Sequence, residues 1–161
     1  MQKYHYLMRF TMRIIFILIA LFVSPFSFSY DCYDKAGNDY KIDPDLLRAV
    51  AFRESSFNPN AINQASSTRY AIGLMQIHSQ NFGELAQYGI TENHLKQDPC
   101  MNIYTGAFYL AKFIRIQGDV WKGVGAYNAG LKKSIEQEQK RNQYALEIYH
   151  IYLKIKENKS T

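Results

Sequence analysis

One carboxylate in this sequence stands where acid chemistry could be done. Glu54 lies in the segment LLRAVAFRESSFN, residues 46–58, four positions after Val50 and seven after Leu47. In a helix these three residues share one face, so the carboxyl group lies beside apolar side chains. Desolvation disfavours the charged form of such a group and raises its pKa, so it can hold a proton near neutral pH. Glu54 is therefore a candidate general acid.

A more ordinary role for Glu54 is that of a solvated charge at the edge of the helix. Arg48 and Arg53 lie in the same segment and are within reach of an ion pair. Most glutamates in helices are exposed, so the helix taken alone favours this ordinary role. The choice depends on what the rest of the chain places opposite the carboxylate.

Other kinds of catalytic site find little support in the sequence. Ser55 lies outside a Gly-x-Ser-x-Gly pattern, and His78, His94 and His150 have no metal-binding partner at helical spacing. We expect these histidines to be structural or exposed. The Gly-x-Gly of residues 123–130, GVGAYNAG, lacks the third glycine of a dinucleotide-binding loop and follows a predicted helix. We therefore expect no metal and no cofactor.

Two aspartate–proline pairs predict helix starts. In Asp43-Pro44 and Asp98-Pro99, the aspartate can accept hydrogen bonds from free backbone N–H groups, and the proline suits the first helical position. The first helix carries Glu54 and should end near Asn58, because a proline follows there. The second helix should end at Gly118.

The remaining elements are also expected to be mainly helical. Residues 59–69 are expected to form a polar loop, residues 70–77 a short strand or an irregular turn, and residues 81–92 a helix and a loop. Trp121 is expected in the core. A final helix followed by a solvated tail is predicted by the spacing of Tyr144, Ile148, Ile151, Tyr152 and Ile155. The pattern predicts a mainly α domain with at most a small β element.

The N-terminal segment has the order of a secretory signal. Basic residues come first (Lys3, Arg9 and Arg13), followed by the apolar run 14–23 and the small residues Ser27 and Ser29. We expect residues 1–29 to be removed after Ser29, which leaves a domain of residues 30–161 in the periplasm. An uncleaved anchor is the alternative.

The expected signal changes how the charge of the chain is interpreted. It holds three of the 19 basic residues and none of the 14 acidic ones, so the net charge of +5 belongs partly to the signal. The remaining chain has no concentrated basic patch that would neutralise phosphates. We therefore exclude nucleic acid as a partner.

The two cysteines of the chain are Cys32 and Cys100. In an oxidising compartment they are expected to pair. The chain-entropy model gives such a crosslink a stabilisation of about 4 kcal/mol. Two free thiols or a metal pair are the alternatives, and the metal pair lacks further ligands at zinc spacing.

Separated segments rich in glycine, amides and tyrosine accompany the acid, and such side chains suit a sugar-binding groove. Three motifs in order carry a resemblance: Glu54-Ser55, GLMQI at residues 73–77, and AYNAG at residues 126–130. They resemble the soluble lytic transglycosylase domain, which has a goose-type lysozyme fold. The chain is similar to the small transglycosylases of type III and type IV secretion, conjugation and pilus systems through Asp98-Pro99-Cys100, Asn102, Gly106-Ala107 and Trp121.

This resemblance implies a reaction in which Glu54 acts first as an acid and then as a base. Glu54 would protonate the oxygen that joins N-acetylmuramic acid to N-acetylglucosamine. It would then take the proton of the muramoyl C6 hydroxyl as that hydroxyl attacks C1, giving a 1,6-anhydro sugar without water. Ordinary glycosidases need two carboxylates, and the neighbouring acids Glu84 and Asp119 are expected to be surface charges.

By the same resemblance, the groove would be lined by Met75, Gln76, Tyr127 and Asn128. Tyr144 would approach Glu54 and help to set its protonation. Related secretion-associated chains often carry an acid two positions before the GLMQ run, where this chain has Ala71. Without that acid, slow turnover is expected.

The expected partners are peptidoglycan glycan strands and a secretion, conjugation or pilus apparatus, with the protein itself a monomer. Two alternatives remain open. One is a hydrolytic muramidase that uses water at the same bond. The other is a non-catalytic subunit that binds the wall or assists machine assembly.

Overall fold

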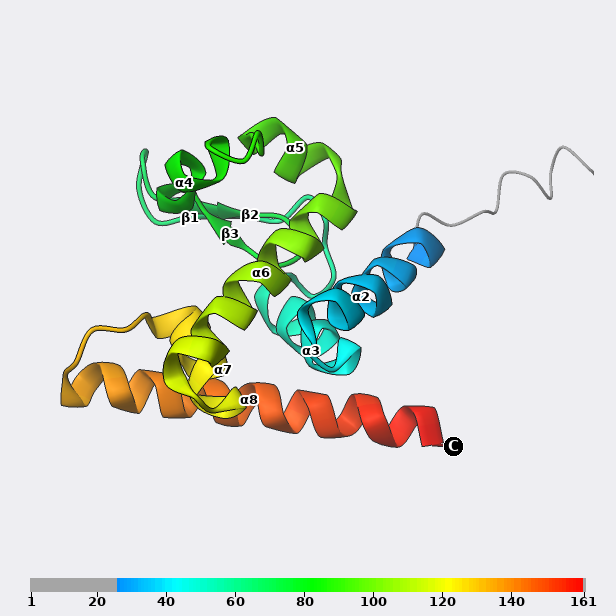
Figure 1. The fold of residues 1–161 in the computed structure, drawn as a ribbon, viewed down its shortest axis with the longest axis vertical. Helices are drawn as coiled ribbons and strands as arrows, with labels where there is room; N and C mark the ends of the chain where they lie inside the picture. Colours follow the sequence, from blue (N-terminus) through cyan, green and yellow to red (C-terminus); the bar gives the residue numbers. More distant parts are fainter. Residues whose placement is uncertain (1–25, 161) are drawn as a thin grey trace, which may run out of the picture. The chain divides into compact units, whose positions relative to one another are not determined.

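The computed structural model describes residues 26–160, with side chains from residue 32 onward, and Figure 1 shows its fold. The signal expected at residues 1–29 lies outside the described residues except for residues 26–29, which begin a helix. The elements that build the site belong to one compact unit that begins at Asp31. Within the described part of the chain, no helix has the length and apolar character that a membrane span requires.

Helices dominate the described chain, as predicted. The α-helices are α2 (Phe26–Tyr40), α3 (Pro44–Ser55), α4 (Phe82–Ala86), α5 (Glu92–Gln97), α6 (Pro99–Gln117), α7 (Val120–Ala129) and α8 (Ile135–Ser160), with a 3₁₀ turn η1 at Ser79–Asn81. The strands are β1 (Ile62–Gln64), β2 (Tyr70–Ile72) and β3 (Ile77–His78). In Figure 1, α6 runs from the sheet and α5 down to α7 and α8. The predicted mainly α fold with a small β element is confirmed.

Both aspartate–proline pairs begin helices. Asp43 accepts a hydrogen bond from the backbone N–H of Asp45 at 2.9 Å, and Asp98 accepts one from the N–H of Met101 at 3.1 Å. Helix α6 ends before Gly118, which has a φ of 66° and so takes the left-handed conformation that favours glycine. These local signals predicted the helix starts correctly.

Helix α3 ends earlier than predicted. It stops at Ser55, and Ser56 and Phe57 both take left-handed backbone conformations with φ values of 51° and 62°. The N–H of Ser56 still bonds to the carbonyl of Phe52 at 2.8 Å, which closes the last turn. Such a reversal, which begins two residues after Glu54, is uncommon outside glycine and is typical of functional sites.

The small sheet is antiparallel in the order β1-β2-β3. Strand β1 lies inside the segment predicted as a polar loop, so that prediction is wrong for residues 62–64. All three of its side chains are exposed, which removes the alternating apolar pattern by which strands are predicted. The strand forms because its backbone pairs with β2, Ile62 opposite Ile72 and Gln64 opposite Tyr70.

The two glycines of the Gly-x-Gly segment allow α7 to pack closely against its neighbours. A Cβ atom on Gly123 would lie 2.5 Å from the Cα of Ile114 in α6. One on Gly125 would lie 2.6 Å from the carbonyl oxygen of Arg141 in α8. Real side chains do not fit at such distances, so these glycines serve helix packing. Trp121, expected in the core, is partly buried against Tyr149 and other side chains of α8.

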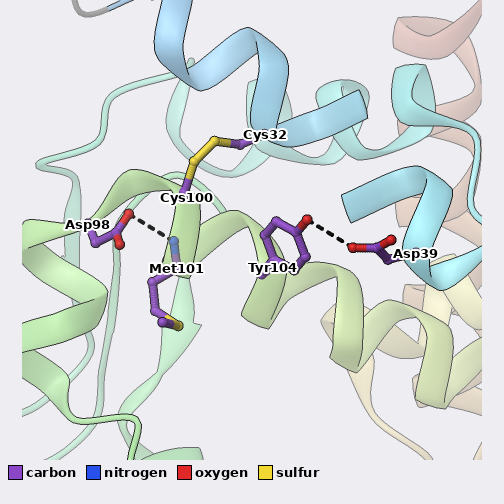
Figure 2. Close-up of a disulfide and its surroundings, with 6 residues drawn as sticks. All are labelled: Cys32, Asp39, Asp98, Cys100, Met101 and Tyr104. Atoms are coloured by element: carbon purple, nitrogen blue, oxygen red, sulfur yellow. Dashed lines mark hydrogen bonds between the residues drawn. A yellow bond between two sulfur atoms is a disulfide. The ribbon is translucent and has the colours of Figure 1, made fainter. Parts of the chain in front are cut away.

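The structure contains the expected disulfide between Cys32 of α2 and Cys100 of α6 (Figure 2). The two Cα atoms are 5.5 Å apart, although the residues are separated by 68 positions in sequence. A second link joins the same two helices, because the hydroxyl of Tyr104 donates a hydrogen bond to Asp39 at 2.9 Å. The disulfide therefore ties α2 to the start of the long helix α6.

Replacing both cysteines, Cys32→Ser with Cys100→Ser, should lower the free energy of unfolding by about 4 kcal/mol, because the unfolded chain regains the entropy of a long open loop. Urea denaturation of the oxidised parent and the variant measures this difference. Adding a thiol reductant to the parent should reproduce most of the loss and leave the variant unchanged. A loss below about 1 kcal/mol would contradict the prediction.

The C-terminal part of α8 holds the start of α3. Lys156 pairs with Asp43 at 2.9 Å and with Asp45 at 3.2 Å. The hydroxyl of Tyr152 also donates to Asp43, at 2.8 Å, and Lys159 pairs with Asp45. The segment predicted as a solvated tail is therefore helical up to Ser160, although residues 157–160 are exposed as expected. Its partners lie more than a hundred positions upstream, where local patterns reveal nothing.

Candidate active site

A cavity of about 580 Å³ opens beside Glu54. Its walls come from the end of α3, the sheet, α4, α6 and α7. Expected site residues on these walls are Glu54, Gln76, Tyr127 and Asn128. The fold thus brings together three motifs that are far apart in the sequence.

Glu54 receives a hydrogen bond from the hydroxyl of Tyr144, which projects from α8 and is 3% exposed. The structure therefore places Tyr144 against Glu54, as the resemblance implied. Burial raises the pKa of the Glu54 carboxyl, whereas the Tyr144 hydrogen bond and the charge of Arg53 lower it. The pKa stays above its ordinary value because desolvation is the largest effect. Glu54 can therefore carry a proton at a higher pH than an exposed glutamate.

The two arginines that could have neutralised Glu54 are engaged elsewhere. Arg53 forms an ion pair with Glu147 of α8 at 2.7 Å. Arg48 forms one with Asp45 at 2.8 Å inside the fold. Neither guanidinium forms an ion pair with Glu54 among the described residues, so the ordinary surface role does not describe this carboxylate.

The turn between β2 and β3 lies beside the end of α3, and its residue Gln76 borders the cavity. Its backbone takes left-handed conformations at Gly73, with a φ of 77°, and at Gln76, with a φ of 48°. The carbonyl of Leu74 accepts a hydrogen bond from the hydroxyl of Ser55 at 2.9 Å. The residue directly after Glu54 is therefore bonded to this turn, which fixes the end of α3 against it.

Asn102 fixes the same turn from α6. Its side-chain amide donates to the carbonyls of Ile72 and Leu95 at 3.0 and 3.2 Å, and its oxygen accepts from the N–H of Met75 at 2.8 Å. Asn102 is 1% exposed. A Cβ on Gly73 would lie 2.1 Å from its amide nitrogen. The sequence marked Asn102 as part of a resemblance, but no pattern indicated this role.

Met75 lies in the core and does not line the cavity. It is 0% exposed and packs against Gly106, where an added Cβ would lie 2.5 Å from the Cβ of Met75. The groove position expected for its side chain is therefore not what the structure shows. Its backbone carbonyl contributes instead by accepting a hydrogen bond from the Tyr127 hydroxyl at 2.7 Å.

Gln76 lines the cavity, but its side chain is largely used to hold the wall. It is 9% exposed, and its amide donates to the carbonyls of Gly73 at 2.8 Å and Ala61 at 3.2 Å. Asn128, at the end of α7, is exposed at the cavity. It also borders a second hollow beside Tyr144. Gln76 therefore shapes the wall, and Asn128 is open to a ligand.

Ala71 lies on β2 and borders the cavity. It pairs with His78 of β3, so its position is fixed by the sheet. An acid at this position would face the same space as Glu54, and alanine supplies no charge there. The departure from the pattern that the resemblance implies therefore falls on the cavity wall itself.

A second carboxylate, Glu84 of α4, also borders the cavity. It forms an ion pair with Lys112 at 2.9 Å and accepts a hydrogen bond from the Tyr109 hydroxyl at 3.1 Å. The hydrogen bond and charge of Lys112 hold its pKa below the ordinary value. Sequence reasoning treated Glu84 as a surface charge, because an acid in a short helix gives no sign of the cavity it borders. Asp119 instead caps α7.

Comparison with known proteins gives consistent matches. Residues 31–151 match the family model described as the transglycosylase SLT domain. The chain is 54% identical over 139 residues to an X polypeptide of Escherichia coli, covering 86% of this chain and 82% of that protein. It is 38% identical over 140 residues to protein IpgF of Shigella flexneri, with coverages of 87% and 91%. For invasion protein IagB of Salmonella typhi the identity is 37% over 146 residues, with coverages of 91% and 90%.

The fold resembles the crystal structure of an inactive mutant of lytic transglycosylase Slt from Pseudomonas aeruginosa. The TM-score is 0.60 and the sequence identity is 22%. The match covers 76% of this chain but 23% of that longer one. At this identity the likeness establishes a shared fold, and the chemistry must be argued from the site.

Proposed function

This chain belongs to the transglycosylase SLT family, and from that premise we propose that it cleaves the β-1,4 bond between N-acetylmuramic acid and N-acetylglucosamine in peptidoglycan. The observation that carries the proposal is Glu54, a desolvated carboxyl of raised pKa on a cavity wall. Such a group can hold a proton until a glycosidic oxygen needs it. The cavity is large enough for part of a glycan strand.

In the first step, protonated Glu54 donates its proton to the glycosidic oxygen as the bond to C1 breaks. The Tyr144 hydroxyl stabilises the carboxylate that forms, because it donates a hydrogen bond to a carboxyl oxygen of Glu54. The same contact orients the carboxyl group toward the cavity. Positive charge that develops at C1 is then close to the new carboxylate.

In the second step, Glu54 acts as a base. It removes the proton of the C6 hydroxyl on the muramoyl residue as that oxygen bonds to C1. The product has a 1,6-anhydro ring, and Glu54 is protonated again for the next cycle. One carboxylate is sufficient, because the substrate supplies its own nucleophile.

A hydrolytic muramidase is the competing proposal, and Glu84 is the observation that favours it. Glu84 borders the same cavity, and hydrolytic glycosidases use two carboxylates. Both oxygens of the Glu84 carboxylate are already bonded, one to Lys112 and the other to the Tyr109 hydroxyl. The lowered pKa also makes this carboxylate a weak base, so it is poorly suited to activate a water. We therefore retain the transglycosylase reaction as the proposed activity.

Product analysis tests the choice between the two reactions. Purified protein is incubated with cell-wall sacculi, and the released muropeptides are weighed by mass spectrometry. A transglycosylase gives anhydro ends, which are lighter by one water than the reducing ends from hydrolysis. Reducing ends without the anhydro product would reject the proposal in favour of a muramidase.

We further propose that the protein acts in the periplasm and opens the wall locally for an envelope machine of the secretion, conjugation or pilus type. The likeness to an invasion protein supports this setting. The disulfide supports an oxidising compartment. Deleting the gene should stall assembly of the machine it serves, and restoring the wild-type protein should repair it. Assembly that proceeds normally in the deletion strain would reject this part.

Replacing Tyr144 with Phe should move the alkaline limit of activity to higher pH. The lost hydrogen bond favours the charged form of Glu54, so its removal raises the pKa of Glu54 further. The acid must be protonated to begin the reaction, and a higher pKa keeps it protonated at higher pH. The pH profile of kcat/KM measures the shift. The control is Tyr149→Phe, because Tyr149 is an exposed tyrosine of the same helix, and its pH profile should equal that of the wild-type protein. If the alkaline limit of activity of Tyr144→Phe did not move, the hydrogen bond would not set the pKa of Glu54.

A further inference from the structure

Two opposite charges occupy one wall of the cavity. Glu84 comes from α4 and Lys112 from α6, and both border the same space as Glu54. Their side chains are 38% and 35% exposed, so neither charge is shut off from a ligand. The mechanism proposed above uses neither residue.

This pair is held in place by aromatic neighbours. The Lys112 ammonium lies 5.6 Å from the ring centre of Tyr109 and 5.9 Å from that of Phe108. Tyr109 is 6% exposed, and its hydroxyl donates a hydrogen bond to Glu84 at 3.1 Å. A cation above aromatic rings and a carboxylate bonded to a buried phenol have few alternative positions. The charges are therefore positioned before any ligand arrives.

Other residues of the cavity suit uncharged sugars. Amide side chains border it at Asn63, Gln64, Gln80 and Asn81. Amides can donate to and accept from hydroxyl and N-acetyl groups. In intact peptidoglycan the glycan itself is uncharged, because the lactyl carboxyl of each muramoyl residue is bonded to its peptide stem. The charged groups of the polymer, carboxylates and ammonium groups, lie on the stems.

We propose that Glu84 and Lys112 bind the peptide stem of the substrate, with Lys112 on a stem carboxylate and Glu84 on a stem ammonium group. This inference rests on the proposed function, because it assigns a binding role within the same cavity. The two charges are already adjacent, so a zwitterionic stem can pair with both without separating them widely. The enzyme would then favour glycan strands that still carry unmodified stems.

The test compares enzyme variants on substrates whose stem charges have been masked while the stems remain in place. Soluble uncrosslinked strands are used intact, with their amines acetylated, or with their carboxylates converted to amides. Acetylation should lower kcat/KM of the wild-type protein by roughly ten- to a hundredfold, the size expected for one charged hydrogen bond. It should have little further effect on Glu84→Gln. Amidation of the stem carboxylates should lower kcat/KM of the wild-type protein to a similar extent, and it should have little further effect on Lys112→Met.

This design reads the coupling between one enzyme charge and one substrate charge, as a double-mutant cycle does. Lys154→Met provides a matched control, because Lys154 is an exposed lysine of α8 that does not border the cavity. It should respond to both masked substrates as the wild-type protein does. A charge exchange, Glu84→Lys with Lys112→Glu, restores an ion pair in reverse order and should not restore the preference for intact stems.

Two results would overturn the inference while leaving the proposed function intact. One is a wild-type protein that cleaves intact and masked strands equally well. The other is a charge exchange that keeps the wild-type preference for intact stems, since residues other than Glu84 and Lys112 would then recognise the stem charges. A wild-type protein that releases no anhydro product from any strand would reject the proposed function, and the inference with it.

Discussion

Glu54→Gln should lower kcat/KM for release of anhydro muropeptides by about a thousandfold or more. An amide of the same shape can still accept the hydrogen bond from Tyr144, but it can neither donate an acidic proton nor take one up. General acid–base catalysis contributes roughly 10² to 10⁴ in rate, and one group here performs both transfers. Chromatography of digested sacculi over a time course measures the loss.

A matched control for this change is Glu136→Gln. Glu136 is an exposed acid of α8 paired with Lys140, so this substitution removes the same charge away from the cavity. The Glu136→Gln variant should digest the wall at the wild-type rate. If Glu54→Gln also kept full digestion, Glu54 would not be the acid. If it lost digestion but still supported machine assembly, the enzyme would serve the machine through binding and not through cleavage.

Asn102→Ala should lower the free energy of unfolding by about 5 kcal/mol. The change leaves three buried backbone groups without partners: the N–H of Met75 and the carbonyls of Ile72 and Leu95. A buried polar group that loses its partner costs about 1 to 3 kcal/mol. The affected turn also borders the cavity, so activity should fall in the fraction that remains folded. Urea denaturation followed by circular dichroism measures the stability.

Asn93→Ala is the control for this prediction. Asn93 is an exposed asparagine of α5 whose amide donates to Gln97 at 3.0 Å, and its removal should cost less than about 0.5 kcal/mol. Equal losses in the two variants would mean that the turn does not depend on Asn102. A smaller loss than expected in Asn102→Ala alone would indicate that water replaces the missing amide.

Features with a local cause could be predicted from the sequence. The aspartates of Asp43-Pro44 and Asp98-Pro99 cap helices through neighbours two or three residues away, so a short segment contains the whole cause. Helical period correctly placed Glu54 beside Leu47 and Val50, which are both 0% exposed, whereas its catalytic role was suggested only by the resemblance. Strand β1 was missed, since its exposed side chains carry no pattern and its formation depends on pairing with β2.

The residues of the candidate site could be predicted where a sequence motif contains them. They could not be predicted where the packing of the helices decides which side chains line the cavity. The contact between Tyr144 and Glu54 spans 90 positions, and the resemblance alone suggested it. The side chain of Met75 turned out to fill the core beside Gly106. Glu84 borders the cavity through the placement of α4 against α6. No local rule distinguishes a methionine facing a groove from one facing the core.

The contacts from α8 to the start of α3 bear on the order in which the protein folds. Tyr152 meets Asp43 across 109 positions, and Lys159 meets Asp45 across 114. Closing loops of that length is entropically costly, so such contacts form late on a folding pathway. The helix that carries Glu54 can therefore start locally at its Asp-Pro cap, but it is secured only when α8 docks. We expect Glu54 to reach its final position beside Tyr144 in the last stage of folding.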